Sequence, residues 1–426
     1  MTGSSPVDAS GTVSPMSIET DDVITDPWLI SADDHVLEPP DIWTDRVPRR
    51  FRDIAPRMVR DRAEVVSATG GRPKFRRSTT GTWADWWCYE ELEVPLTQVS
   101  AASGLEVVDY LPTTLDEVRP GCWRRADRLA DMDTNHVQAS VCFPNTLPRF
   151  CGQTFCEAKD KDLALACVQA YNDWIIEDWG GGEAQGRLIP VTLVPLWDSR
   201  LAAVEVRRCA DKGSAAITFT ENPSRLGLPS FHDAKGYWEP LFSACEDTGS
   251  VVNIHIGSSS VSPTTAADAP QAVSSALFAT NTMGALCDLL ISGIFVRHPG
   301  LQVSFAEGQI GWMPYTLQRL DTVWAGRDRD SLIGIRLDQP PSQYARTNVY
   351  GCIFDDEVGL ANRERIGMSQ IMFEVDYPHS DSTFPNSLAV FDRLASSAFL
   401  SANERYLLAR GNAIAAFGLA RYGITE

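Results

Sequence analysis

No apolar run of about 20 residues occurs in this sequence, so we expect no helix that crosses a membrane. The first 25 residues are rich in Ser, Thr and Asp, and they lack both the basic flank and the apolar core of a secretory signal. We therefore interpret residues 1–25 as a flexible tail and expect a cytoplasmic protein.

Positive charge is also scarce. Lys and Arg total 37 against 56 Asp and Glu, which gives a formal net charge of −19. Such a chain repels the phosphate backbone of nucleic acids and the surface of anionic lipids. We therefore expect a small-molecule substrate and neither a nucleic-acid nor a membrane partner. The assembly that we expect is a homo-oligomer, a dimer.

Two further motifs are missing. There is no C-x-x-C pair, and ten cysteines in 426 residues do not make a disulfide scaffold, so we expect buried, reduced thiols. The stretch HIGSSS at 255–260 contains serines without the G-x-S-x-G elbow that positions a nucleophile. The sequence therefore argues against a serine hydrolase.

Short apolar or β-branched runs alternate with longer helical patterns from about residue 124 onward, which is typical of repeated βα units. With one run near the N-terminus, the candidate strands are 28–32, 137–143, 188–196, 215–220, 251–256, 302–306, 347–350 and 370–374. The clearest helices are 158–179, 201–212, 237–247, 312–323 and 386–398. This pattern predicts the α/β class and a closed (β/α)8 TIM barrel rather than an open doubly wound sheet.

A long segment separates the first two predicted strands. Residues 41–123 contain many Pro, Gly and Arg residues and the tryptophans Trp83, Trp86 and Trp87. We interpret this segment as an insertion that caps one mouth of the barrel and shapes the pocket. Residues 26–426 then form a single barrel domain.

Polar residues end several of the predicted strands, and in such barrels the reacting groups gather at those ends. The first strand ends in Asp33 and His35, the fifth in His255, the sixth in Glu307 and the eighth in Asp376. Residues two apart in a strand face the same side, so Asp33 and His35 can bind one ion while the residue between them faces away. Imidazole and carboxylate ligands suit zinc, iron or manganese.

The sequence resembles the amidohydrolase-related metal-dependent hydrolases, the group that also contains aminocarboxymuconate semialdehyde decarboxylase. The similar stretches are SADDHVLEPPDIW, RLADMDTNHVQASVCFPN, RLIPVTLVPLWD, ENPSRLGLPSFHD, NIHIGSSS, EGQIGW and FEVDYPHSDSTFP. The resemblance implies that Asp376, in the D-Y-P-H of the last stretch, is the strand-eight metal ligand and proton acceptor.

The same resemblance implies roles for the other strand-end residues. His35 matches the second His of an H-x-H pair, Asp33 stands where the first is usual, and His255 matches the strand-five His. Glu307 falls where many members have a His, and no lysine ends the fourth strand, where relatives with two metals carry a carboxylated one. One or two divalent ions are therefore both possible. Three carboxylates and a bound hydroxide carry four negative charges, which two divalent ions would neutralise.

Alternatives stay open for several residues. Glu307 is either a ligand or a cap for the helix that begins near Gly311. His379 and Asp381, after the eighth strand, contact substrate, orient ligands or stabilise a turn. Arg149 is a candidate clamp for an anionic substrate, or it forms a salt bridge within its loop.

Two more residues carry weaker expectations. Trp312 is the tryptophan that we place close to the substrate, although aromatic residues in the first turn of a barrel helix are commonly structural. Glu38 lies near the site and has no predicted catalytic role.

The leading functional hypothesis is hydrolysis of an amide, ester, lactone or thioester by metal-activated water. Asp376 would take the proton of that water, and His379 or another water would protonate the leaving group. The alternative is a metal-dependent, non-oxidative decarboxylation of an aromatic or unsaturated acid, in which Arg149 would matter more. A barrel that holds metal only structurally is disfavoured, because several polar strand ends converge on one open mouth.

Overall fold

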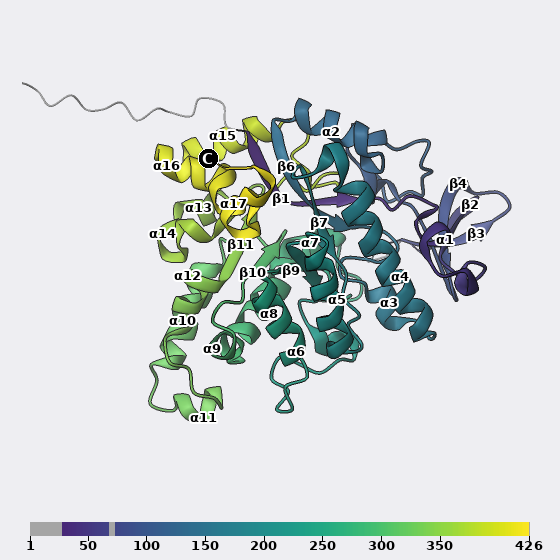
Figure 1. Cartoon of the computed structure of the whole chain (residues 1–426). Helices are drawn as coiled ribbons and strands as arrows, with labels where there is room; N and C mark the ends of the chain where they lie inside the picture. Colours follow the sequence, from purple (N-terminus) through teal and green to yellow (C-terminus); the bar gives the residue numbers. More distant parts are fainter. Residues whose placement is uncertain (1–27, 68–72, 426) are drawn as a thin grey trace, which may run out of the picture.

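A parallel sheet of eight strands forms the centre of the computed structural model, which describes residues 28–67 and 73–425; the predicted tail, 1–25, lies outside them. Helices surround these strands (Figure 1). In sheet order the strands are β1 (Leu29–Val36), β6 (Val137–Pro144), β7 (Leu188–Thr192), β8 (Ala216–Phe219), β9 (Val251–His255), β10 (Val303–Ala306), β11 (Val349–Ile353) and β12 (Ile371–Phe373). The predicted TIM barrel is confirmed, with each strand where the sequence pattern indicated.

The first and last strands of the sheet meet at their carboxyl ends. The Asp376 N–H donates to the Asp33 carbonyl (2.9 Å), and the His35 N–H donates to the Tyr377 carbonyl (2.6 Å). These bonds satisfy backbone groups that an open sheet would leave unpaired at its edges. They also bring residues more than 300 positions apart in the chain to one rim of the barrel.

The helices predicted most clearly are α4 (Lys161–Trp174), α5 (Ser199–Asp211), α6 (Glu239–Thr248), α10 (Met313–Trp324) and α15 (Ser387–Ser397). Local signals explain their limits. Asp160 and Asp198 accept backbone N–H groups at the starts of α4 and α5, and Gly249 ends α6 in the left-handed conformation. The remaining helices are α1 (Ile42–Arg46), α2 (Arg125–Thr134), α3 (Gln153–Glu157), α7 (Gln271–Leu277), α8 (Ala279–Ile291), α9 (Ile294–Arg297), α11 (Arg329–Ile333), α12 (Pro341–Asn348), α13 (Glu357–Ala361), α14 (Arg363–Ile366), α16 (Ala402–Tyr406) and α17 (Asn412–Phe417).

Alternation along the strands separates two apolar cores. In β12, Ile371 and Phe373 pack in the large core that includes the surrounding helices, whereas Met372 belongs to a second cluster with Ala139 and Cys352. The second cluster fills the barrel interior with side chains, as is usual for this architecture.

The segment 41–123 contains a separate antiparallel sheet, which the sequence analysis did not predict. Its strands are β2 (Arg57–Ser67), β3 (Lys74–Ser78), β4 (Thr82–Tyr89) and β5 (Leu92–Pro95), in the order β3-β2-β4-β5. Figure 1 shows this sheet to one side of the barrel, beside α1.

The three tryptophans of β4 have different environments. Trp87 is fully buried and its ring meets Trp43 of α1 edge to face, with centroids 5.0 Å apart. Trp86 is buried in a small core of the added sheet, whereas Trp83 is 48% exposed. Trp87 therefore packs the sheet against α1 and belongs to the large core, and the predicted role of this cluster in the pocket stays a prediction.

One helical stretch, Gln271–Ile291, is long and apolar enough to cross a membrane by length and composition. This differs from the sequence-based expectation. A helix packed in a protein core passes the same test, and here α8 contributes Leu286, Leu289 and Leu290 to the large core. The expectation of no membrane partner stays a prediction.

All ten cysteines are free thiols in the structure. Cys167 and Cys245 are buried in α4 and α6, where they pack in the large core as small apolar side chains. Cys209 is buried in α5, and its thiol donates to Glu205 Oε1 at 3.5 Å. The prediction of reduced thiols therefore fits the structure.

Candidate metal centre

The end of β1 is irregular, and this irregularity aims its polar side chains. The pairing of β1 with β6 shifts register between Ser31 and Asp34, which is the sign of a β-bulge. Asp34 turns away from the barrel mouth and accepts hydrogen bonds from the Ser140 hydroxyl and the Tyr377 N–H (2.8 Å). Asp33 and His35, by contrast, both face the inside of the mouth.

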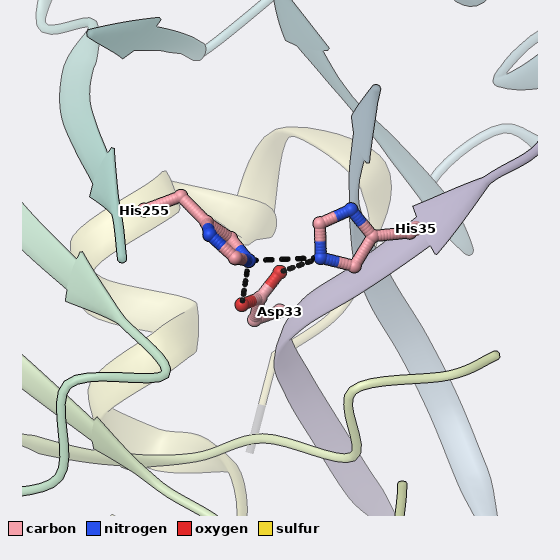
Figure 2. A group of neighbouring side chains, drawn as sticks. All are labelled: Asp33, His35 and His255. Atoms are coloured by element: carbon pink, nitrogen blue, oxygen red, sulfur yellow. Dashed lines mark hydrogen bonds and ion pairs between the residues drawn. The ribbon is translucent and has the colours of Figure 1, made fainter. Parts of the chain in front are cut away.

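His35 and His255 present the same ring atom to the same point, as Figure 2 shows. Each Nδ1 lies against a carbonyl, of Pro144 (2.9 Å) and Ile256 (2.6 Å) respectively, and a carbonyl can only accept. Each Nδ1 therefore carries the proton, and each Nε2 offers a lone pair. Burial lowers the pKa of both imidazoles, most strongly that of His35, so both rings are neutral.

The two Nε2 atoms are 2.9 Å apart, and neither has a proton to share with the other. Two lone pairs at this distance repel unless a cation lies between them. Two nitrogens that each lie about 2.1 Å from one ion are roughly 3.0–3.4 Å apart at angles of about 90–110°. The separation is close to that range, so the pair fits a shared metal ion.

Two carboxylates complete the group. Asp33 Oδ1 lies 3.5 Å from His35 Nε2, Asp33 Oδ2 lies 3.3 Å from His255 Nε2, and Asp376 Oδ1 lies 3.7 Å from His35 Nε2. Asp33 and Asp376 are fully buried, and neither carboxylate oxygen of Asp33 accepts a hydrogen bond. Native proteins rarely leave such oxygens unsatisfied, because each costs about 1–3 kcal/mol or more when it carries charge. A divalent ion would satisfy these oxygens.

Without a metal, burial and neighbouring negative charges disfavour ionisation of the carboxyl groups. Burial, followed by the charges of Glu307 and Asp34, raises the pKa of Asp33 well above its ordinary value. Burial and the charges of Asp33 and Asp381 raise the pKa of Asp376 in the same way. Asp381 itself is exposed on the loop after β12.

Glu307 lies at the same centre rather than at the start of a helix. Its Oε2 is 3.5 Å from His255 Nε2, and burial and then the charge of Asp376 raise its pKa to about 8. The N–H groups of Ile310 and Gly311 donate instead to Asp356 Oδ2, at 2.7 and 2.6 Å. The alternative interpretation, in which Glu307 caps α10, is therefore wrong.

His379 contacts the group from the loop after β12. Its Nδ1 is 2.9 Å from Asp376 Oδ1, and its ring stacks on His35 with centroids 3.9 Å apart. The Asn145 side-chain amide lies 3.3 Å from His379 Nε2 and also donates to the Ser100 carbonyl at 3.1 Å. His379 therefore links a candidate ligand to the loop after β6 and to the segment 41–123.

The loop after β6 is held by Glu38, which is 1% exposed. Its carboxylate accepts the N–H groups of Asn145 (2.7 Å) and Thr146 (3.1 Å), and burial raises its pKa to about 7. The loop after β12 is held by Ala102, whose N–H donates to the Pro378 carbonyl at 2.7 Å. Glu38 therefore positions the rim, and residues near 100–103 are one part of the long insertion that contacts the site loops.

Among the residues that the structure describes, Arg149 and Trp312 form no hydrogen bond or ion pair with the central group. Arg149 Nη1 donates to Glu157 at 3.0 Å, and its other terminal nitrogen contacts the Ser260 hydroxyl. Trp312 Nε1 donates to the Gly308 carbonyl at 2.8 Å in the first turn of α10. Both side chains are engaged in local contacts of the rim, and their roles towards a substrate stay predictions.

Two residues of the centre were missed by the sequence analysis. Glu374 is fully buried and its Oε2 accepts the Glu307 N–H at 3.0 Å. It precedes Asp376 by two residues, so the alternation of β12 already indicated that both face inward. Phe150 stacks on His255, with centroids 4.1 Å apart. It follows β6 in a loop, and no periodic signal marks it.

Comparison with known proteins agrees with this geometry. The amidohydrolase family profile matches residues 53–419. A 2-amino-3-carboxymuconate-6-semialdehyde decarboxylase from Dictyostelium discoideum is 26% identical over 314 residues, which are 71% of this chain and 79% of that protein.

Solved structures share the fold at lower identity. An amidohydrolase from Mycobacterium avium subsp. paratuberculosis has a TM-score of 0.68 and 20% identity, over 92% of this chain and 99% of its own. A dihydroxybenzoic acid decarboxylase from Polaromonas sp. JS666, with bound manganese, has a TM-score of 0.54 and 20% identity, over 72% and 90%. The match to the family profile spans most of the barrel, and the rim of this barrel carries the imidazoles and carboxylates of a candidate metal centre. The chain therefore belongs to the amidohydrolase family of enzymes.

Proposed function

We propose that this protein is a metal-dependent, non-oxidative decarboxylase that acts on a small aromatic or unsaturated carboxylic acid. The observation that carries the proposal is the flat ring of Phe150, stacked at 4.1 Å on the candidate ligand His255. This ring gives the centre an apolar wall for a planar substrate. The relatives named above as decarboxylases support this reaction over hydrolysis, for which the same donor set would serve.

His35, His255, Asp33 and Asp376 would hold a divalent ion, whose chemistry is to bind and polarise the oxygens of a substrate acid. Zinc, iron and manganese all suit these ligands. The neutral rings are oriented by the backbone carbonyls at their Nδ1 atoms, which keeps each Nε2 aimed at the centre.

Asp376 is the residue that we propose to hold the proton of the reaction. Its carboxyl group delivers this proton to the substrate carbon that bears the carboxylate, so that a C–H bond forms. The C–C bond to the carboxylate then breaks, its electron pair returns to the conjugated system, and carbon dioxide leaves. His379, at 2.9 Å from Asp376 Oδ1, is placed to return a proton from solvent.

The test is to incubate manganese-loaded protein with hydroxylated aromatic acids and unsaturated acids, and separately with esters, lactones and amides. We expect carbon dioxide from one or more acids, and its loss in Asp376→Asn. An exchange of the exposed Asp53 for Asn is the matched control and should leave the rate unchanged. Cleavage of an ester, lactone or amide, with no carbon dioxide from any acid, would overturn the proposal in favour of hydrolysis.

We also propose a small-molecule substrate without nucleic-acid or membrane partners, a cytoplasmic location and a homodimer. The net charge of −19 supports the first of these proposals. Sedimentation of the purified protein tests the dimer.

A further inference from the structure

Glu221 is a buried carboxyl group at the barrel rim that the candidate metal centre does not use. It follows β8 by two residues and is 1% exposed. Its Oε1 accepts the N–H (3.4 Å) and the hydroxyl of Ser259, and the side-chain amide of Asn281 at 3.0 Å. Within the described residues, its Oε2 is buried and accepts no hydrogen bond. One oxygen therefore fixes the carboxyl group in place, and the other is left without a partner.

The elements that hold Glu221 also border the metal centre. Ser259 follows the candidate ligand His255 by four residues, in the loop after β9, and Asn281 lies in the first turn of α8. Burial lowers the pKa of His255, and the charges of Glu307 and Glu221 oppose this shift. Glu221 is therefore within electrostatic reach of the centre.

The aromatic wall of the centre lies beside the same group. Phe150 packs against Gly257, where an added Cβ would lie 3.4 Å from Phe150 Cε2. The Gly257 N–H acts on Glu221, since it favours the ionised form and lowers the pKa of that carboxyl group. The Thr218 hydroxyl at the end of β8 donates to the Phe150 carbonyl at 2.6 Å. The ring of Phe150 and the carboxyl group of Glu221 thus belong to one interlocked part of the rim.

This arrangement suits a ligand that carries a hydrogen-bond donor. The groups that donate to Oε1 are neutral, and burial still raises the pKa of Glu221 although these donors oppose the shift. An N–H or O–H of a ligand at Oε2 would stabilise the ionised carboxylate, because it would supply the contact that water makes with an exposed one. An ionised carboxylate accepts and cannot donate, so it would repel an acceptor in the same place.

We propose that Glu221 is a specificity-determining residue, whose Oε2 accepts a hydrogen bond from a hydroxyl or amino group on the ring of the substrate. The substrate is then an acid with a second, donor-bearing substituent, and its ring lies against Phe150. The inference rests on the proposed function for the class of acid. A site that binds a substrate donor with a buried acceptor discriminates strongly against analogues that lack the donor, because the acceptor is then left unpaired.

The experiment measures by calorimetry how manganese-loaded protein binds benzoic acids with one hydroxyl, amino or methoxy group, placed meta or para to the carboxylate. We expect the wild-type protein to bind the best hydroxyl or amino acid about 10–100-fold more tightly than its methoxy counterpart, which is the range for one hydrogen bond to a charged group. The wild-type preference is measured without any variant, so it tests the proposal by itself.

Glu221→Gln changes the character of the free position and keeps its shape. The amide oxygen can take the place of Oε1, and the amide nitrogen then replaces Oε2 with a donor. The preference should therefore reverse in favour of the methoxy acid, with the metal content unchanged, which a residue that only supports the fold would not cause. Glu364→Gln, at an exposed position of α14, is the matched control and should keep the wild-type preference.

Carbon dioxide measured in the same samples separates this proposal from the proposed function. A preference for the donor-bearing acids that reverses in Glu221→Gln, without carbon dioxide from any of them, refutes the decarboxylase and supports the role of Glu221. Equal affinities of the wild-type protein for the donor and methoxy acids overturn that role. The same preference in Glu221→Gln as in the wild type, or no binding of any of these acids, also overturns it.

Discussion

Glu307 makes the stability of the metal-free protein depend on pH in an unusual direction. Burial, followed by the charge of Asp376, raises its pKa from 4.5 to about 8 in the folded state. Between these values the folded protein keeps a proton that the unfolded chain has lost. Because the unfolded chain binds fewer protons, the free energy of unfolding falls as the pH rises through this window.

The magnitude follows from the shift. One pKa unit corresponds to about 1.4 kcal/mol, so raising the pH from about 5 to about 9 removes about 4 kcal/mol of stability through Glu307. Burial raises the pKa values of Asp33, Asp376 and Glu374 in the same direction, which adds to the loss. Bound metal competes with protons for these carboxylates, so the stability of the loaded protein should fall much less over the same pH range.

Urea unfolding at about pH 5, 7 and 9, with and without manganese, measures this effect. Glu307→Gln should flatten the pH dependence of the metal-free protein, whereas exchange of the exposed Glu106 for Gln should not. If the metal-free protein keeps constant stability or becomes more stable over this range, the reasoning is refuted.

Three further predictions concern packing and the substrate wall. Arg128 is fully buried, donates to the carbonyls of His35 and Gly121, and offsets the charge of Asp34. Arg128→Met should therefore reduce the free energy of unfolding by about 3–5 kcal/mol. A loss below about 1 kcal/mol would contradict this prediction. In the same denaturation assay Trp87→Ala should cost about 3–5 kcal/mol and Trp83→Ala under about 1 kcal/mol, and equal costs would refute the assigned packing. Phe150→Ala should raise KM for a planar acid without changing the metal content. Phe399→Ala, at an 89% exposed position, is the control and should change neither quantity. An unaltered KM in Phe150→Ala would show that Phe150 does not contact the substrate.

Much of the architecture was readable from local pattern. A strand that is buried on both faces has a short apolar sequence, and a repeated βα pattern predicts parallel pairing. The eight strands could therefore be located from the sequence alone. The polar residues that end such runs stand out for the same reason. Asp33, His35, His255 and Asp376 were all found in this way.

Other features depend on partners distant in the chain. The bulge in β1 arises where Asp34 meets Ser140 and the Tyr377 N–H, and a periodic pattern holds no sign of either contact. Glu307 follows a strand and precedes a helix, so its sequence position fits a cap and a ligand equally well. Only the approach of Asp356 to the start of α10 shows which role is taken.

The sequence by itself determined which side chains end the strands, because alternation and burial are properties of each strand. The tertiary structure alone decided that two neutral imidazoles meet at 2.9 Å, with the carboxylates of Asp33, Glu307, Glu374 and Asp376 around them. Closure of the barrel sets these distances, and closure depends on hydrogen bonds between the first and last strands that no local stretch of sequence contains.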